Sequence, residues 1–305
     1  MEPQPQITLQ NLSTETRNLQ TQNLDQMTPL EIATAMNKED LKVASSITPH
    51  LQLISEAITI ASTSLKNGGR IFYMGAGTSG RLGVCDAAEC PPTFSASPTD
   101  FIGLIAGGPS AFIKAVEGAE DSLTLGKEDL IKYNCTSKDT IIGLAASGRT
   151  PYVIGGLIYG KEIGCKTISI SCNLNSEIGK IADVKIEVVV GPEVLTGSTR
   201  LKAGTAQKMI LNMISTGAMV LCGKVYGNLM VDLMQNNKKL KVRAENIVME
   251  VTGVDREKAR NVIENANGSV KVAIVMILGN VDCEEAKKRL EKGDGFVRKA
   301  LDIGK

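Results

Sequence analysis

The sequence has almost none of the side chains on which nucleophilic hydrolases depend. Its 305 residues include one histidine, His50, and no tryptophan. A Ser-His-Asp or Cys-His catalytic unit would have to use His50. This residue follows a proline at the start of the apolar helical pattern LQLI, which is more typical of a helix entry than of a catalytic base. Proton transfer by this chain is therefore expected to use carboxylates.

The cysteines and the charges exclude further classes of protein. Seven cysteines, an odd number, form no C-x-x-C pair, which argues against a disulfide framework and against a zinc site. We therefore expect no metal and a reduced, cytoplasmic location. With 34 basic and 33 acidic residues, the formal charge of +1 provides no broad surface for nucleic acid. A small anionic ligand needs only a local site and is compatible with this balance.

Long apolar segments are also missing. The longest uninterrupted apolar run, VAIVMIL at 272–278, is far shorter than the ~20 residues that cross a bilayer. The beginning of the chain is polar and lacks the basic and apolar parts of a signal peptide. The sequence therefore predicts no membrane partner.

The pattern of helices and strands predicts three parts. Residues 1–51 are expected to form an N-terminal arm with helices, one of which starts at Thr28-Pro29. Residues 52–221 alternate helical segments with five short runs rich in branched residues: RIFYMG, DFIGLIAG, DTIIGLAAS, CKTISIS and VKIEVVV. This alternation predicts an α/β domain with a doubly wound, five-stranded parallel sheet.

Residues 222–305 are predicted to form a small all-α unit without strands. Within it the segment 253–274 aligns with 280–301. Asp255 and its counterpart Asp282 are expected to cap helices, and a glycine follows each helix at the equivalent position. The two segments therefore predict two copies of a helix-turn-helix unit.

A glycine-rich loop follows the first predicted strand. Residues 75–80, GAGTSG, fit the GxGxxG dinucleotide fingerprint. A dinucleotide site also requires an acidic residue at the end of the second strand. Here the second strand begins with Asp100 and ends at Gly107-Gly108. The acidic residue therefore stands at the start of this strand and not at its end. The loop fits a phosphate better, held at the start of a helix near Gly77, Thr78 and Ser79.

A second loop of the same kind follows the third predicted strand. It contains Ser147, Gly148, Arg149 and Thr150, and a proline stands at the first helical position. Two hydroxyl-bearing turns at the ends of adjacent strands are suited to holding one phosphomonoester between them. A third segment, 196–202, is equally compatible with an anion site and with a helix cap.

Two carboxylates are placed where they can act on such a ligand. Glu89 lies in CDAAECPPT, where Pro91 is expected to end the helix just after the glutamate. Glu120 lies in KAVEGAEDS after the second strand, and Glu117 is a rival for its role because residues three apart share a helix face. Both segments follow the carboxyl ends of neighbouring strands, where ligands of such sheets bind.

Four segments carry a resemblance to a known family. YMGAGTSGRLGVCDAAECPPTF, AVEGAED, GLAASGRTPYV and GPEVLTGSTRLKAGTAQKMILN resemble the N-acetylmuramic acid 6-phosphate etherases of the sugar isomerase (SIS) domain superfamily. The resemblance covers nearly the whole chain. It implies a lyase of amino sugar metabolism and peptidoglycan recycling that cleaves the D-lactyl ether of N-acetylmuramic acid 6-phosphate, without cofactor or metal.

The resemblance also implies roles for single residues. Glu89 is the acid that protonates the departing lactyl oxygen and later activates water, and Glu120 is the second acid or base. Ser79, Ser147 and Thr150 bind the sugar phosphate. The chain departs from many superfamily members by having alanines at 145 and 146 in place of hydroxyl or amide side chains. Phosphate binding would then depend more on backbone amides and on Arg149 or Arg81.

Three other functions remain as alternatives at this stage. Related proteins bind sugar phosphates as regulators without catalysis, and aldose-ketose isomerases need no acid for a leaving group. A dinucleotide oxidoreductase is the third alternative. The apolar segment 205–234 suggests a homodimer, although the same residues are equally suited to an intrachain core.

Overall fold

The structure, a computed structural model, describes residues 12–235 and 237–303. These residues form two compact units: residues 12–87 with Phe101–Ile214, and Ala88–Asp100 with the residues from Ser215 onward. The start of the predicted N-terminal arm, residues 1–11, lies outside the described residues. The three-part division expected from the sequence stays a prediction.

The first unit is built on a five-stranded parallel sheet with the order β2-β1-β3-β4-β5. Each strand falls within one of the five predicted runs, so the predicted α/β fold is confirmed. The strands are β1 (Ile71–Gly75), β2 (Phe101–Ile105), β3 (Thr140–Leu144), β4 (Lys166–Ser171) and β5 (Val184–Glu187).

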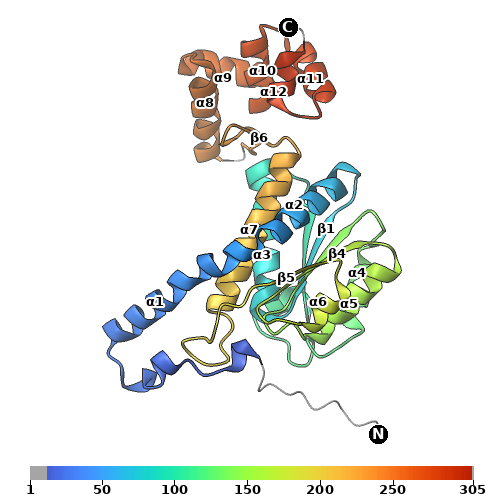
Figure 1. The fold of residues 1–305 in the computed structure, drawn as a ribbon. Helices are drawn as coiled ribbons and strands as arrows, with labels where there is room; N and C mark the ends of the chain where they lie inside the picture. The colour runs from blue at the N-terminus through green and yellow to red at the C-terminus, as the bar shows by residue number, and fades with distance from the viewer. Residues whose placement is uncertain (1–11, 236, 304–305) are drawn as a thin grey trace. The chain divides into compact units, whose positions relative to one another are not determined.

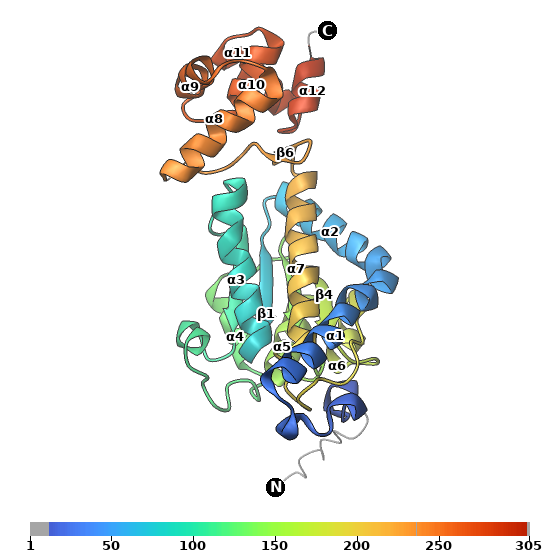
Figure 2. The same cartoon turned by 90° about the vertical axis from the view of Figure 1, so that its left-hand side faces the viewer.

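Helices cover both faces of this sheet (Figures 1 and 2). One face carries α4 (Leu125–Lys132), α5 (Pro151–Glu162) and α6 (Glu177–Ile181), and the other carries α2 (Leu51–Lys66), α3 (Gly77–Phe94) and α7 (Lys202–Leu221). Alternate residues of a strand point to opposite faces. Phe72 and Met74 therefore share a core with the α4 and α5 side, and the doubly covered strands are apolar throughout.

The N-terminal part of this unit consists of short turns and one long helix. The 3-10 turns η2 (Ser13–Glu15), η3 (Leu19–Thr21) and η4 (Leu24–Gln26) precede α1 (Pro29–Ile47), and η5 (Thr48–His50) leads into α2. Thr28 and Glu31 form a capping box at the start of α1. His50 stands immediately before α2 without a side-chain capping bond, so its predicted position at a helix entry is confirmed.

The second unit contains a small hairpin that the sequence analysis missed. Strands β6 (Val225–Tyr226) and β7 (Leu229–Met230) pair antiparallel, so the prediction of no strands after residue 222 is wrong. Each strand has two residues, too few to show an alternating pattern. The helices follow as α8 (Lys238–Thr252), α9 (Arg256–Asn265), α10 (Val270–Gly279), α11 (Cys283–Lys292) and α12 (Val297–Asp302).

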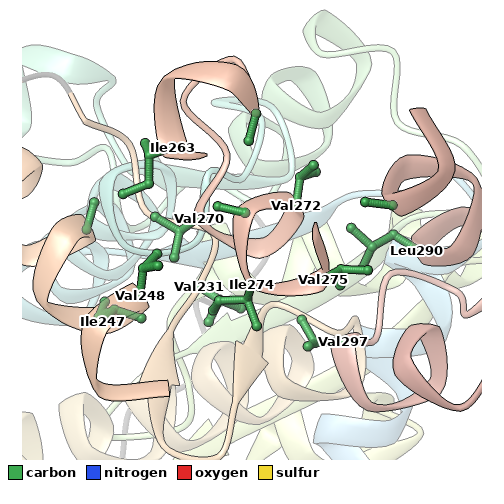
Figure 3. Packing of buried hydrophobic residues seen from close by; sticks show 14 of the residues in the cluster. Val231, Ile247, Val248, Ile263, Val270, Val272, Ile274, Val275, Leu290 and Val297 are labelled. Carbon is green, nitrogen blue, oxygen red and sulfur yellow. The ribbon is translucent and has the colours of Figure 1, made fainter. Parts of the chain in front are cut away.

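The predicted internal repeat is confirmed. Asp255 caps α9 and Asp282 caps α11, each accepting a backbone N–H from three residues further on at 2.8 Å. Gly268 and Gly295 adopt φ of 82° and 79°, a conformation in which glycine is strongly favoured. Figure 3 shows how the apolar side chains of both copies meet around α10, with Val270, Ile274 and Val275 at the centre.

The two capping aspartates allow a direct test of this unit. Asp255→Ala or Asp282→Ala should each lower its free energy of unfolding by about 1 kcal/mol, because a backbone N–H of the first turn loses its acceptor. Asp255→Asn keeps an acceptor and serves as the matched control. Urea unfolding of the full chain measures the differences, and an unchanged midpoint in the alanine variants contradicts the capping role.

Among the described residues no single helix is both long and apolar enough to cross a membrane. The helices α9 and α10 meet that criterion only as a pair, and they are bent by 110° relative to one another.

Candidate active site

The order of the strands places the point where the chain connections diverge between β1 and β3. Their last residues, Gly75 and Leu144, are paired in the register. The chain leaves β1 for α3 on one face of the sheet and leaves β3 for α5 on the other face (Figure 1). Ligands of open parallel sheets bind where the connections diverge in this way. The structure therefore brings the two predicted phosphate loops to neighbouring strand ends.

Close packing explains the glycines of the first loop. A Cβ atom on Gly75 would lie 2.7 Å from the nitrogen of Gly80, and one on Gly80 would lie 2.6 Å from the carbonyl oxygen of Gly75. Gly77 has a φ of +52° and begins α3. The GxGxxG pattern thus reflects a tight turn from strand to helix. Thr78 and Ser79 lie in the first helical turn, whose N–H groups have no acceptor within the helix.

Ser79 has a partner that the sequence analysis missed. Its hydroxyl is buried and donates a hydrogen bond to Oε1 of Gln207 at 2.8 Å. Gln207 lies on α7 and is 1% exposed. Gln207 belongs to the family-like segment GTAQK, but nothing in its spacing indicates a contact with a residue so distant along the chain.

The second loop is held in a turn that leaves its hydroxyls near the start of α5. Ser147 Oγ accepts the N–H of Arg149 at 3.3 Å, and Gly148 donates its N–H to Ala145 at 3.0 Å. Thr150 stands immediately before α5, and its side chain makes no capping hydrogen bond. Ser147, Arg149 and Thr150 are half-buried. The geometry thus supplies two side-chain hydroxyls, a guanidinium and a helix N-terminus.

Gly148 is required at its position for two reasons. Its φ is +74°, and a Cβ atom there would lie 2.3 Å from the Cβ of Ser176. Gly148→Ala should therefore lower the free energy of unfolding by about 1–3 kcal/mol through strain and overpacking. Gly68→Ala is the matched control, because Gly68 has a φ of +73° with open space around it. Thermal unfolding measures both variants. An equal loss of stability in the two would show that the close contact with Ser176 contributes nothing.

Glu120 lies in a segment that is not helical. The residues between η6 (Pro109–Phe112) and α4 form turns and bends, so the argument that Glu117 and Glu120 share a helix face is wrong. The φ of +74° at Gly118 interrupts any helix there. The carbonyl oxygen of Glu120 accepts the N–H of Tyr152 at 3.0 Å. This bond fastens the backbone of Glu120 to the first turn of α5, while the carboxylate is exposed.

Arg81 is bonded to the backbone of a neighbouring turn. Its Nε donates to the carbonyl of Phe112 at 2.8 Å and its Nη2 donates to that of Ala111 at 2.9 Å. Both carbonyls belong to η6, which precedes the segment of Glu120. The pairing of Arg81 with phosphate stays a prediction. Within the described ranges, no group of three His, Cys, Asp or Glu side chains is arranged to hold a metal ion.

Glu89 lies inside a helix rather than at its end. Helix α3 continues through Pro91 and Pro92 to Phe94, so the expected stop after Glu89 is wrong. Phe94 and Cys90 are buried, and their packing offsets the backbone hydrogen bonds that the prolines remove. Glu89 is exposed. It belongs to the second unit, and its proximity to Glu120 stays a prediction.

The third candidate segment, 196–202, is a helix start that already has a carboxylate. Glu193 is fully buried and accepts the N–H groups of Lys202 and Ala203 at 3.0 and 2.9 Å. Burial raises the pKa of Glu193, against the effect of these N–H groups and of the Lys202 charge. The ammonium of Lys202 lies 2.6 Å from Oε2 of Glu39 on α1 and is also buried. The structure thus favours the helix cap, and Lys202 is not available for a substrate carboxylate.

Comparisons with known proteins agree with this architecture. Residues 52–161 match the family described as the glucokinase regulatory protein N-terminal SIS domain, and residues 125–216 match the SIS domain. The structure of a phosphoheptose isomerase from Francisella tularensis has a TM-score of 0.50 at 16% identity, covering 64% of this chain and 100% of that protein. At this identity the likeness concerns the fold alone.

Sequence relatives are far closer and cover almost the whole chain. An N-acetylmuramic acid 6-phosphate etherase from Geobacillus sp. (strain WCH70) is 58% identical over 293 residues, which cover 96% of this chain and 99% of its own. Another from Pectobacterium atrosepticum is 55% identical over 295 residues, which cover 97% of both chains. This chain therefore belongs to the N-acetylmuramic acid 6-phosphate etherase family of carbon–oxygen lyases.

Proposed function

We propose that this protein cleaves the D-lactyl ether of N-acetylmuramic acid 6-phosphate, giving N-acetylglucosamine 6-phosphate and D-lactate in amino sugar recycling. The observation that carries the proposal is the full-length similarity at 58% identity to a protein of that name. The paired ends of β1 and β3, with a hydroxyl-bearing loop after each, support a phosphosugar site in the first unit.

The chemistry requires two carboxylates and no cofactor. In the open-chain sugar the hydrogen on carbon 2 is acidic because it lies beside the aldehyde. We propose that Glu120 removes this proton, and that the electron pair forms a double bond between carbons 2 and 3. The bond from carbon 3 to the lactyl oxygen then breaks, and Glu89 gives that oxygen a proton. Water, activated by Glu89, adds to carbon 3, and carbon 2 regains a proton.

The phosphate is proposed to bind between the two loops. Ser79, Ser147 and Thr150 contribute hydroxyl groups, and Arg149 contributes a positive charge. The N–H groups at the starts of α3 and α5, including those around Gly77, Thr78 and Gly148, favour an anion because both helix dipoles point toward it. The bond between the Glu120 carbonyl and the N–H of Tyr152 supports Glu120 over Glu117, because it holds the Glu120 backbone beside α5.

We also propose that the enzyme is a cytoplasmic homodimer. The seven cysteines form no disulfide with one another in the described part of the chain, which is compatible with a reduced compartment. The segment 205–234, which first suggested a dimer, contributes Ile210 and Ile214 to the core of the chain. Support for a dimer now comes from α1, where Leu30 and Leu41 are 77% and 73% exposed. Light scattering should give twice the 32.4 kDa of one chain, and a mass of 32.4 kDa would refute the dimer.

The experiment that tests the proposed function follows D-lactate after the purified protein is mixed with N-acetylmuramic acid 6-phosphate. The same sugar without phosphate is the control and should react far more slowly at equal concentration. Binding of the phosphosugar without lactate release would favour a regulator. Conversion of an aldose phosphate to a ketose phosphate without lactate would favour an isomerase.

A further inference from the structure

The amide of Gln207 is incompletely paired in a fully buried place. Its Oε1 accepts the hydroxyl of Ser79 at 2.8 Å. Its Nε2 is buried and has no hydrogen-bond partner among the described residues. A buried donor without an acceptor is destabilising, because it has lost its hydrogen bonds to water. Such a group next to a candidate phosphate-binding serine indicates a second arrangement in which Nε2, rather than Oε1, is paired with Ser79.

The present arrangement also conflicts with phosphate binding by Ser79. A serine hydroxyl carries one hydrogen, and here Gln207 accepts it. The hydroxyl therefore offers only lone pairs to a ligand, and the oxygens of a phosphate dianion are acceptors as well. Ser79 is able to donate to a phosphate only after its hydrogen is released from Gln207.

We propose that Gln207 is a positioning residue that sets the direction of the Ser79 hydroxyl, an inference that rests on the proposed function. When a sugar phosphate binds, the amide turns over, Nε2 donates to Ser79 Oγ, and the hydroxyl donates to the phosphate. The two ends of a glutamine amide have nearly the same size, so the turn needs no repacking. It gives Nε2 an acceptor and the phosphate a donor, while Oε1 gives up the Ser79 hydrogen, so the gain comes from the new bond to the phosphate.

The packing at the start of α7 holds Gln207 beside α3. Ala203 and Ala206 are fully buried. A Cβ on Gly204 would lie 3.4 Å from Cγ2 of Thr78, so the start of α7 is in close contact with the first turn of α3. Glu193 fixes that end of α7 through two N–H groups. Gln207 is therefore held beside Ser79 whether or not a ligand is bound.

The test compares Gln207→Glu, Gln207→Met, Ser79→Ala and the double variant Ser79→Ala/Gln207→Met. Calorimetry measures the binding of N-acetylglucosamine 6-phosphate, and kinetics measure kcat and KM for lactate release. A hydrogen bond to a charged group contributes about 1.5–3 kcal/mol, so each single variant should weaken binding about 10- to 100-fold and raise KM more than it lowers kcat. Gln207→Glu should recover binding at acidic pH, where the protonated carboxyl is able to donate.

The outcomes separate this inference from the proposed function. The double variant should bind no more weakly than either single variant, because both substitutions remove the same hydrogen-bonded chain. Additive losses of binding affinity in the double variant would overturn the inference, and so would wild-type affinity in Gln207→Met. The proposed function would still stand in either case if the wild-type protein releases lactate. A wild-type protein that releases no lactate refutes the function itself. If Gln207→Glu does not fold, Gln207→Met and the double variant still test whether Gln207 positions the Ser79 hydroxyl.

Discussion

Replacing Glu120 or Glu89 with glutamine is expected to lower the rate of D-lactate release by roughly 10²- to 10⁴-fold, the usual contribution of a general acid or base. Glutamine keeps the size of the side chain but does not exchange a proton. Glu89 and Glu120 are both exposed, so neither substitution should lower stability. Binding of N-acetylglucosamine 6-phosphate should be retained, since neither substitution changes a proposed phosphate ligand.

The same variants separate the two roles. In heavy water the Glu89→Gln protein should still exchange the hydrogen on carbon 2, because Glu120 is proposed to remove it, whereas Glu120→Gln should not. Glu117→Gln is the matched control, since Glu117 lies in the same exposed segment and no role is proposed for it. A large loss of activity in Glu117→Gln, with normal activity in Glu120→Gln, would show that Glu117 and not Glu120 has the proposed role.

Replacing Lys202 with methionine is expected to lower the free energy of unfolding by about 3 kcal/mol. Removal of one partner from a buried ion pair typically costs 3–5 kcal/mol, because it leaves an uncompensated charge. Here the loss should lie near the lower end of that range, since Glu39 keeps a second partner in Lys42 at 2.6 Å. Lys42→Met is the control: its side chain is 54% exposed, and exposed pairs contribute about 0–1 kcal/mol. Equal losses in the two variants, measured by urea unfolding, would refute the special role of Lys202.

The pH dependence of stability provides an independent check on this pair. Burial raises the pKa of Glu39, but hydrogen bonds and charges from Lys202 and Lys42 outweigh it and lower the pKa from 4.5 to about 2. The stabilisation is therefore complete above pH 4.5 and is lost as the pH falls toward 2. Lys202→Met should reduce this loss between pH 4.5 and 2. If the free energy of unfolding of Lys202→Met falls with pH as steeply as that of the wild-type protein, Lys202 does not hold Glu39 in its ionised form.

Much of the fold could be predicted because its signals are local. Runs of branched residues mark all five strands, and the helix caps at Thr28, Asp255 and Asp282 each depend on neighbours within three residues. The extension of α3 beyond Pro91 was missed because buried packing at Phe94 overrides a local rule. The hairpin at β6 and β7 was missed because its strands are too short to show a pattern.

The site could be predicted only in part for the same reason. The two loops could be predicted because each comes directly after a strand pattern. Parallel pairing of β1 with β3 then brings them together. The partners of these loops come from distant parts of the chain. Gln207 meets Ser79, and Glu39 meets Lys202, only after α1, α3 and α7 have packed, and no spacing in the sequence encodes those contacts.

Elimination and addition of water are proposed to cleave the ether between carbon 3 and its oxygen. The most direct test runs the reaction of wild-type protein with N-acetylmuramic acid 6-phosphate in water labelled with heavy oxygen. Cleavage by this route should leave one labelled oxygen at carbon 3 of N-acetylglucosamine 6-phosphate and none in D-lactate, which keeps the ether oxygen. Label in the lactate, with none at carbon 3 of the sugar, would contradict it, because the bond to the lactyl carbon would then be the one that breaks.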